Sequence, residues 1–370
     1  MPTALDLFCG AGDLSAGLAT TGFNLVGAVD AWPVAVETYR RNFKHPVVCA
    51  DLGLLSGGEL REMLGLGALR PDLVAGGPPC QGFSVQRIGA DRDIRNQLVL
   101  EFARFVLDLR PRVFLMENVM GLLGSRGRLL AQRFEEMLVT GGYVVNHRRV
   151  NAAEYGVPQQ RNRVFFYGWE RLAFRRWRFP AAERTPAEFR TTWDAIGDLP
   201  SPSRDYSPSP TDALHRRTRM SPLNQQRLAL IPPGGGFEDL PADLRANCHR
   251  NGAARIGHRG VYGRLAPDRP SATITARFDS FTRGRFAHPY EDRNITLREG
   301  ARLQTFPDFF KFVGSQEEIA AQIGNAVPPL LASVLGKSLV EYLHQQEGDL
   351  AGHQSGSAVQ IGLQMGDLLA

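Results

Sequence analysis

The sequence predicts an α/β protein with a doubly wound sheet, because apolar runs of strand length alternate with helical patterns in its first 170 residues. The predicted strands are residues 4–8, 25–29, 47–49, 73–75, 113–116, 143–145 and 164–167. The predicted helices are residues 14–20, 33–43, 98–109 and 127–139. Such alternation is typical of a parallel sheet with helices on both faces, whose ligands bind at the carboxyl ends of the strands.

Beyond about residue 170 the periodic pattern gives way to an irregular stretch rich in Pro, Gly, Ser and Arg, such as "IPPGGGF" at 231–237. Helical signals resume at Thr296, which begins a capping box with Glu299, so the chain returns to its first domain. The last residues are rich in Gly, Gln and Ser, and we expect them to be flexible. The predicted units are a first domain of residues 1–169 and 294–345, a smaller inserted domain of residues 170–293, and a tail of residues 346–370.

The composition, 43% hydrophobic and 22% charged, is typical of a globular protein, and the sequence has no apolar run of membrane-spanning length. The first residues carry neither the basic nor the apolar region of an export signal, so we expect a cytoplasmic protein. The cysteines are far apart and lack zinc-site spacing, which predicts reduced thiols and no metal site. They are Cys9, Cys49, Cys80 and Cys248.

The net charge of +5 is concentrated in residues 170–293, which hold 21 Arg, no Lys and 14 acidic residues. This segment carries +7 and the remainder of the chain −2. An Arg-only basic segment suits recognition of phosphates and base edges, because the guanidinium fork bonds bidentately where an ammonium is a point charge. A coding bias towards Arg would produce the same composition and remains an alternative.

A glycine-containing turn follows the first predicted strand in "DLFCGAGDLSAGL" at 6–18. Gly10 and Gly12 let the backbone approach a ligand closely, and the next strand ends at Asp30, where a carboxylate would accept both hydroxyls of an adenosine ribose. Asp51 follows a third strand in the same position and would accept from an adenine amino group. A helix-capping role for Asp30 and an ordinary turn role for Asp51 are the alternatives.

The stretch "GGPPCQGFS" at 76–84 places Cys80 just past an apolar strand, on the edge where that ligand would bind. The surrounding Gly and Pro predict a rigid turn that leaves the sulfur open. A lone cysteine is more often a small buried hydrophobe. The flanking prolines and the polar residues that follow favour an accessible thiol here.

Two further strands bring polar side chains to the same edge. "FLMENV" at 114–119 includes Glu117, a carboxylate that an apolar strand holds away from water, so that it could keep and donate a proton. "QQRNRVFF" at 159–166 carries Arg161 and Arg163 at alternating positions, so both are expected on one side of a strand. Arginines on exposed strands are common, so this pattern alone is weak.

Taken together, these blocks resemble the C5-cytosine DNA methyltransferases, in that family's order, over residues 4–168 and 262–344. The matching stretches are DLFCGAG at 6–12, Pro79-Cys80 with Gln-Gly-Phe-Ser, Glu117-Asn118-Val119, Gln159-x-Arg161-x-Arg163, REGARLQTFPD at 298–308 and QIGNAVPP at 322–329. Three positions depart from the family's usual residues: Asp13 stands for a second glycine, Asp30 for a frequent Glu, and Gly300 for a usual Ala.

The resemblance implies a Rossmann-like methyltransferase domain that uses S-adenosylmethionine, with residues 170–293 as a smaller target-recognition domain inserted before the C-terminal helices. It implies that Cys80 attacks C6 of the target cytosine, and that Glu117, Arg161 and Arg163 complete the catalytic site. Around S-adenosylmethionine the resemblance places Phe8, Gly10, Gly12, Asp30, Asp51, Pro78 and Asn325.

A base inside a duplex is out of reach of Cys80, so the cytosine must be flipped out and covered. We expect residues 81–97 to close over it. The DNA-binding residues predicted in this segment are Ser84, Arg87, Arg92 and Arg95. We expect double-stranded DNA as the partner, a monomer, and a cognate restriction endonuclease that acts separately, as for a prokaryotic or phage modification enzyme.

Two other functions stay open on the sequence. A eukaryotic branch of the family methylates transfer RNA, and it carries Cys-Phe-Thr where Ser280-Phe281-Thr282 stands here. A silent DNA-binding relative would have lost the nucleophile or the cofactor loop, whereas Cys80, Glu117 and Arg163 are all present.

Overall fold

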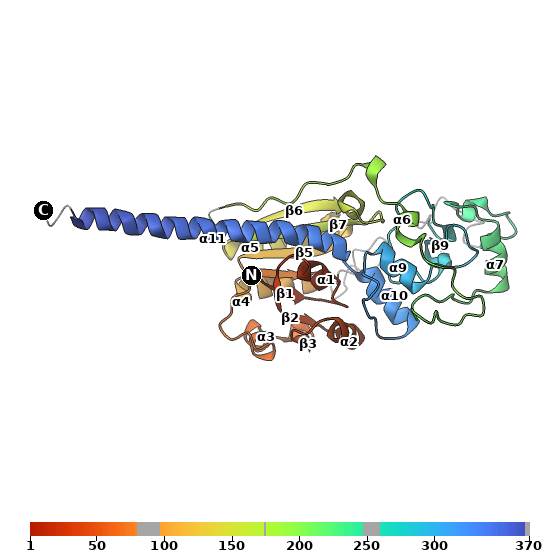
Figure 1. Cartoon of the computed structure of the whole chain (residues 1–370), viewed down its shortest axis with the longest axis horizontal. Helices are drawn as coiled ribbons and strands as arrows, with labels where there is room; N and C mark the ends of the chain where they lie inside the picture. The colour runs from red at the N-terminus through yellow and green to blue at the C-terminus, as the bar shows by residue number, and fades with distance from the viewer. Residues whose placement is uncertain (80–96, 174, 247–259, 367–370) are drawn as a thin grey trace.

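A seven-stranded sheet organises the larger part of the molecule, with a smaller unit beside it (Figure 1). The computed structural model describes residues 1–79, 97–173, 175–246 and 260–366, with side chains up to residue 347. The strand order is β3-β2-β1-β4-β5-β7-β6. The strands are β1 (Thr3–Leu7), β2 (Asn24–Asp30), β3 (Val47–Cys49), β4 (Leu73–Gly76), β5 (Val113–Val119), β6 (Tyr143–Asn151) and β7 (Asn162–Glu170).

The sheet is mixed, so the prediction of a parallel sheet is wrong for its last part. The first five strands in this order, β3, β2, β1, β4 and β5, are parallel, but β7 runs antiparallel to both β5 and β6. A parallel connection needs a crossover of a dozen or more residues, usually a helix, and residues 152–161 between β6 and β7 are too few for one. The apolar pattern of β7 reports its burial and not its direction.

Helices cover both faces of the sheet, as the doubly wound pattern predicts. One face packs against α1 (Asp13–Ala19) and α11 (Pro329–Gly366), and the other against α3 (Gly57–Met63), α4 (Leu98–Leu109) and α5 (Arg128–Thr140). Neighbouring residues of one strand alternate between the two cores, because successive side chains point to opposite faces. The helix α2 (Pro33–Asn42) packs through Tyr39 against the end of β2.

The helix α11 continues through the segment that the sequence predicts to be a flexible tail, and it extends away from the rest of the molecule (Figure 1). Extending a formed helix costs little compared with nucleating one, so a helix anchored on the core can continue through weakly helical residues. Within Gln316–Glu347, which includes α10 (Gln316–Asn325) and the first part of α11, one 18-residue window has the mean hydropathy (1.3) of a membrane span, but 72% of this window is buried. It therefore has the burial of a core helix.

The smaller unit contains little regular structure. Its elements are α6 (Thr192–Ile196), α7 (Pro222–Ala229), β8 (Gly263–Arg264), β9 (Arg285–Ala287), α9 (Leu297–Leu303) and α10 (Gln316–Asn325). Its apolar core combines Phe278 and Phe286 with Leu303, Phe306 and Ile323. The helices α9 and α10 thus pack with the inserted segment, and the boundary at residue 293 runs through this core.

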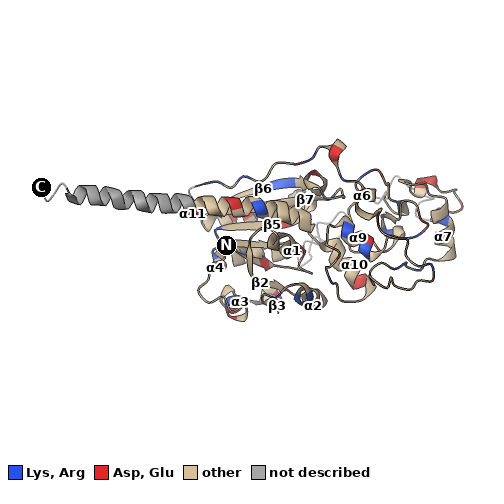
Figure 2. Ribbon diagram, viewed as in Figure 1, with Lys and Arg blue, Asp and Glu red and all other residues tan. Residues whose placement is uncertain are grey.

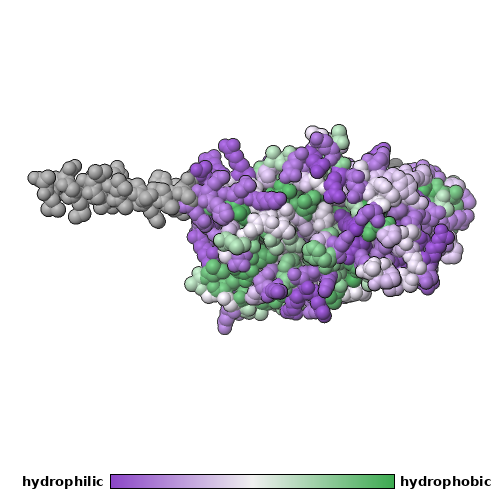
Figure 3. All heavy atoms as spheres, viewed as in Figure 1, coloured by the Kyte–Doolittle hydropathy of each residue, from purple (hydrophilic) through white to green (hydrophobic). Residues whose placement is uncertain are grey.

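The face drawn in Figure 3 is mostly polar, and an apolar patch lies near α3 at its lower left. Leu54 is 83% exposed there and Met63 50%. Basic and acidic residues alternate along α9, where Arg298, Glu299 and Arg302 follow within one turn and a half (Figure 2). Each of the three makes an ion pair: Arg298 with Asp212, Glu299 with Arg293, and Arg302 with Asp198 and Asp308.

Candidate active site

Three residues in the loop between β1 and α1 have backbone angles that glycine adopts easily and most other residues do not. Phe8, Gly10 and Gly12 have positive φ angles of 59°, 52° and 95°. A Cβ on Gly12 would lie 2.4 Å from a ring carbon of Phe43 and 2.8 Å from one of Tyr39. The loop therefore requires glycine at position 12, because the two rings leave no room for a side chain.

Asp30, the last residue of β2, holds this loop in place. Its Oδ2 accepts from the Gly10 N–H at 2.8 Å, and its Oδ1 accepts from the Trp32 N–H at 2.8 Å. Burial raises the pKa of this carboxyl, and the two N–H donors oppose the shift. Each oxygen keeps a second acceptor position, so ribose hydroxyls can still donate to it. The half-buried Trp32 was missed by sequence reasoning, although an aromatic residue just after a strand-ending acid is a usable signal.

Asp51 lies at the same edge, beyond β3, whose Cys49 pairs with Asp30 in the sheet. Its Oδ1 accepts from the Gly53 N–H at 2.9 Å and caps a short 3₁₀ turn, and the residue is exposed. The turn role that the sequence left as an alternative is thus present. The exposed carboxylate can also accept from a ligand.

The end of α10 meets the cofactor loop. Asn325 is the last residue of α10 and is exposed, and two residues later the Val327 N–H donates to Asp13 Oδ2 at 2.6 Å. Asp13, the first residue of α1, is only 8% exposed. Two segments from opposite ends of the chain therefore form one side of the site, as the resemblance predicts.

The segment that leads to Cys80 is fixed by a buried asparagine. Asn118 is 2% exposed, and its Nδ2 donates to the carbonyl oxygen of Pro78 at 3.1 Å. This bond joins the residues after β4 to the end of β5. Cys80, Ser84, Arg87, Arg92 and Arg95 lie outside the described residues.

Glu117 and Arg163 form an ion pair at the carboxyl edge of β5, with Glu117 Oε1 2.8 Å from Arg163 Nε. Arg163 is opposite Val119 in the antiparallel ladder, so it is diagonal to Glu117 on the same face. The side chains are 11% and 17% exposed. A Cβ on Gly77 would lie 3.7 Å from Glu117 Oε2, so bare backbone leads from the carboxylate towards Pro78.

Arg161 is 1% exposed, whereas the Arg163 side chain is 17% exposed. Its Nη1 donates to the carbonyl oxygens of Ile274 at 3.1 Å and Gly324 at 3.2 Å. Burial and the neighbouring Arg163 lower its pKa to about 9. Arg161 immediately precedes β7, and its hydrogen bonds connect this end of the sheet to the inserted segment and α10.

The buried Gln159 strengthens the same joint. Its Nε2 donates to Leu303 O at 3.2 Å and to Gln304 Oε1 at 2.8 Å, and its Oε1 accepts from the Ile274 N–H at 2.9 Å. A single side chain thus bonds α9 and the inserted segment to the sheet unit. Periodicity could not identify this role, because the partners are more than 100 residues away.

The C-5 cytosine-specific DNA methylase model matches residues 3–341. The chain belongs to this family. It is a DNA (cytosine-5-)-methyltransferase, and the family uses S-adenosylmethionine as methyl donor.

Curated relatives align along most of this methyltransferase. It is 32% identical to the Type II methylase M.HgiDII of Herpetosiphon aurantiacus, over 93% of the chain and 97% of that protein. It is 36% identical to the Type II methyltransferase M.XorII of Xanthomonas oryzae pv. oryzae, over 93% of the chain and 86% of that protein. The likeness therefore includes the inserted region and is not confined to the sheet.

Solved structures share the fold. A prophage-encoded protein from E. coli, assigned as a DNA modification methyltransferase, superposes with a TM-score of 0.71 at 27% identity, covering 93% of this chain and 100% of that one. The Entamoeba histolytica methyltransferase EhMeth superposes with a TM-score of 0.64 at 16% identity, covering 93% and 99% of the two chains. At that identity the second likeness supports the fold alone.

Packing explains one departure of this methyltransferase from the family's usual residues. A Cβ on Gly300 would lie 2.1 Å from a ring carbon of the buried Phe278, so an alanine there would collide with it. No group of three His, Cys, Asp or Glu that could hold a metal ion occurs among the described residues.

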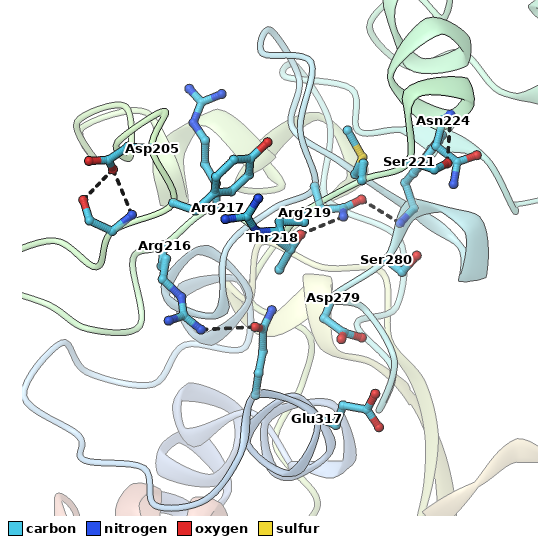
Figure 4. Close-up of a pocket in the computed structure, with 16 residues that line it drawn as sticks. Asp205, Arg216, Arg217, Thr218, Arg219, Ser221, Asn224, Asp279, Ser280 and Glu317 are labelled. Atoms are coloured by element: carbon cyan, nitrogen blue, oxygen red, sulfur yellow. Dashed lines mark hydrogen bonds between the residues drawn. The ribbon is translucent and has the colours of Figure 1, made fainter.

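A separate open cavity of about 750 Å³ lies in the small unit, at the start of α10 (Figure 4). Arg216 and Arg219 are exposed in its wall, and the Arg219 guanidinium lies 4.5 Å from the centre of the Tyr206 ring. Asp279 and Glu317 also line it, so its charge is mixed. Its described walls include no residue of the sheet edge.

Proposed function

We propose that this methyltransferase modifies C5 of a cytosine flipped out of duplex DNA, with Cys80 as the covalent nucleophile. The observation that supports this best is the Glu117–Arg163 pair. It lies at the carboxyl edge of β5, where Asn118 is bonded to Pro78 two residues before Cys80. A base held there would meet a carboxyl group, a fixed cation and the segment that carries the thiol.

The proposed chemistry requires each of these groups. C5 of cytosine is a poor nucleophile, so the Cys80 thiolate first forms a bond to C6 and converts the ring into an enamine. The addition places negative charge on N3 and O2, which Glu117 as proton donor and Arg163 as cation would neutralise. Bound S-adenosylmethionine supplies an electrophilic methyl group to C5. Loss of the C5 proton then expels the thiolate and regenerates Cys80.

The carboxyl edge of the sheet suits S-adenosylmethionine, because the carboxylates of Asp13, Asp30 and Asp51 lie near a loop whose glycines carry no side chain. A Cβ on Gly10 would lie 3.6 Å from Asp13 Oδ1, so no side chain separates the loop from that carboxyl. Asp30 would accept from the ribose hydroxyls and Asp51 from the adenine amino group. The proposed cofactor-binding residues are Phe8, Gly10, Gly12, Asp30, Asp51, Pro78 and Asn325.

We assign Arg161 a positioning role, since its described hydrogen bonds go to backbone carbonyls of the inserted segment and α10. It would hold the recognition region in place over the base that Arg163 contacts. Exposed arginines of residues 170–293, including Arg216, Arg219 and Arg277, would contact DNA phosphates. Ser84, Arg87, Arg92 and Arg95 remain the proposed contacts of the closing segment.

The relatives that are Type II methyltransferases support a modification role. We propose that the enzyme protects specific sites from a restriction endonuclease that acts separately. Under this proposal it works in the cytoplasm as a monomer.

The decisive test uses tritiated S-adenosylmethionine and unmethylated duplex DNA of mixed sequence, followed by digestion to nucleosides. We expect a labelled 5-methylcytosine peak, and we expect Cys80→Ser to lose turnover by about 10⁴-fold or more, because it removes the nucleophile. Cys49→Ser, which alters an exposed thiol on β3, is the matched control and should retain activity. Full activity of Cys80→Ser would contradict the proposed chemistry.

A trapping experiment tests the covalent step directly. Duplex containing 5-fluorocytosine at target positions cannot release fluorine as a proton is released, so the adduct should persist on a denaturing gel. The wild type and Cys49→Ser should form it, and Cys80→Ser should not. If the tritium assay were repeated with transfer RNA and labelled it while duplex DNA stayed unlabelled, the RNA-modifying alternative would be favoured.

A further inference from the structure

Asp13 occupies an unusual position for a carboxyl group. It lies at the start of α1 with 8% of its surface exposed, between the cofactor loop and the junction of α10 and α11. Its Oδ2 accepts from the Val327 N–H at 2.6 Å, and its Oδ1 is close to the bare backbone of Gly10. A neutral side chain could make the same bond to Val327, so the joint alone does not account for an acid.

The charges around Asp13 are predominantly acidic. Glu117 on β5 disfavours its ionised form and Arg161 favours it, but burial is the largest influence and raises its pKa to about 7. Asp13 in turn raises the pKa values of other neighbouring groups, and these are Asp6, Cys9 and Tyr39. A ligand cation placed beside the loop would relieve this excess of acidic groups.

We propose that Asp13 is a specificity-determining residue of the cofactor site, which favours the cationic methyl donor over the product that has lost its sulfonium charge. The inference rests on the proposed binding of S-adenosylmethionine at this loop. Attraction between opposite charges is strong in a site closed to water. Methyl transfer removes the sulfonium charge, so S-adenosylhomocysteine loses this attraction and is released more readily.

Binding of S-adenosylmethionine should release a proton from Asp13. Binding of the cation stabilises ionised Asp13, so a proton leaves the carboxyl for solvent as the complex forms. The ionised carboxylate also accepts more strongly from the Val327 N–H. Cofactor binding thereby tightens the joint between the two ends of the chain.

The test is calorimetric binding of S-adenosylmethionine and S-adenosylhomocysteine to the full-length protein at pH 6 and pH 8. With the pKa of Asp13 at about 7 in the free protein, affinity for S-adenosylmethionine should rise about fivefold between these pH values. S-adenosylhomocysteine should show a much smaller rise. At pH 7, titrations in buffers of different ionisation enthalpy should report release of about half a proton with the first ligand only.

The variant Asp13→Asn keeps the size and the acceptor for Val327 but removes the charge. It should lower the affinity for S-adenosylmethionine by about tenfold at pH 8 and leave the affinity for S-adenosylhomocysteine nearly unchanged. It should also abolish the difference in S-adenosylmethionine affinity between pH 6 and pH 8. Asp6→Asn is the control, since burial raises the pKa of Asp6 well above its usual range and its hydrogen bond goes to Ser15. It should not change the ratio of the two affinities.

Four outcomes would overturn the inference. If Asp13→Asn lowered the affinity for both ligands equally, the role of Asp13 would be structural only. If it lowered neither affinity, Asp13 would not belong to the cofactor site. Absence of both pH dependence and proton release in the wild type would refute the charge role without any variant. A wild type that binds neither molecule would instead refute the proposed cofactor site, and this inference with it.

Discussion

In the sheet unit, backbone groups pair with one another along seven strands, whereas in the small unit arginine side chains bond many of the buried carbonyl oxygens. Arg264 is 3% exposed and donates to the carbonyl oxygens of four residues and to Asp292 Oδ1. The four carbonyls belong to Leu228, Ile231, His288 and Glu291. One guanidinium thus does for an irregular chain what a neighbouring strand does for β5.

Arg293 supplies a second example. It is 3% exposed and donates to both carboxylate oxygens of Glu299 at 2.8 and 2.7 Å. Burial raises the pKa of Glu299, but the hydrogen bonds and charge of Arg293 outweigh it and hold this pKa below its ordinary value. Lysine could not replace either residue in these contacts, because only arginine offers five donors in a planar fork.

Of the changes considered, removal of the Arg264 guanidinium should have the largest effect on stability. Arg264→Leu leaves four buried carbonyls and a carboxylate without their donor, and we expect the free energy of unfolding to fall by about 3–5 kcal/mol. Urea titration followed by circular dichroism measures it. Arg41→Leu, which breaks an exposed i,i+4 pair with Glu37 in the sheet unit, should change it by less than about 0.5 kcal/mol. Similar effects of both variants would contradict the account.

A pH series sharpens the comparison through His288 in the small unit. Its Nδ1 accepts from the backbone N–H groups of Tyr290 and Glu291, and burial lowers its pKa to about 4. Below pH 6.5 the unfolded chain binds a proton on this histidine and the folded protein does not, so stability is lost as pH falls towards 4.

Between pH 7.5 and pH 5 this single group should lower the free energy of unfolding by about 2 kcal/mol. His288→Asn keeps an acceptor without titrating, so the difference between wild type and variant should shrink as pH falls. An identical pH profile for wild type and His288→Asn would refute the assignment.

A smaller effect is expected from filling the space at Gly300. Gly300→Ala drives a methyl group into Phe278, and overpacking of this kind costs about 1–3 kcal/mol. Phe278→Leu should partly restore stability in the double variant. In the sheet unit Gly58→Ala, whose Cβ would meet Ser56 Oγ only at 3.9 Å, should stabilise α3 by roughly 0.5 kcal/mol. A stabilising Gly300→Ala would contradict the packing described here.

Much of the sheet unit was predictable because its contacts follow local periodicity. The strands β1, β2, β4 and β5 begin and end within a few residues of their predicted limits. The helix α3 was missed, since Gly57 and Gly58 suggest a turn, although Ser56 and Glu59 form a capping box there. The antiparallel direction of β7 was also beyond a pattern that reports only burial.

The site was predictable where motifs carry chemistry and unpredictable where contacts are distant. The edge that brings Glu117 to Arg163, and Asp30 to the Gly10 loop, follows from strand order. The bonds from Arg161 to Ile274 and from Val327 to Asp13 join positions 113 and 314 residues apart. No periodic pattern specifies such partners.

The contact between Val327 and Asp13 also sets an order of events during synthesis. The cofactor loop leaves the ribosome near the start of translation, and its last partner follows 314 residues later. At about 5–20 residues per second, the wait is roughly 15–60 seconds. A nascent chain therefore lacks this hydrogen bond for that interval, and termination before Val327 yields a protein in which Asp13 never acquires this donor.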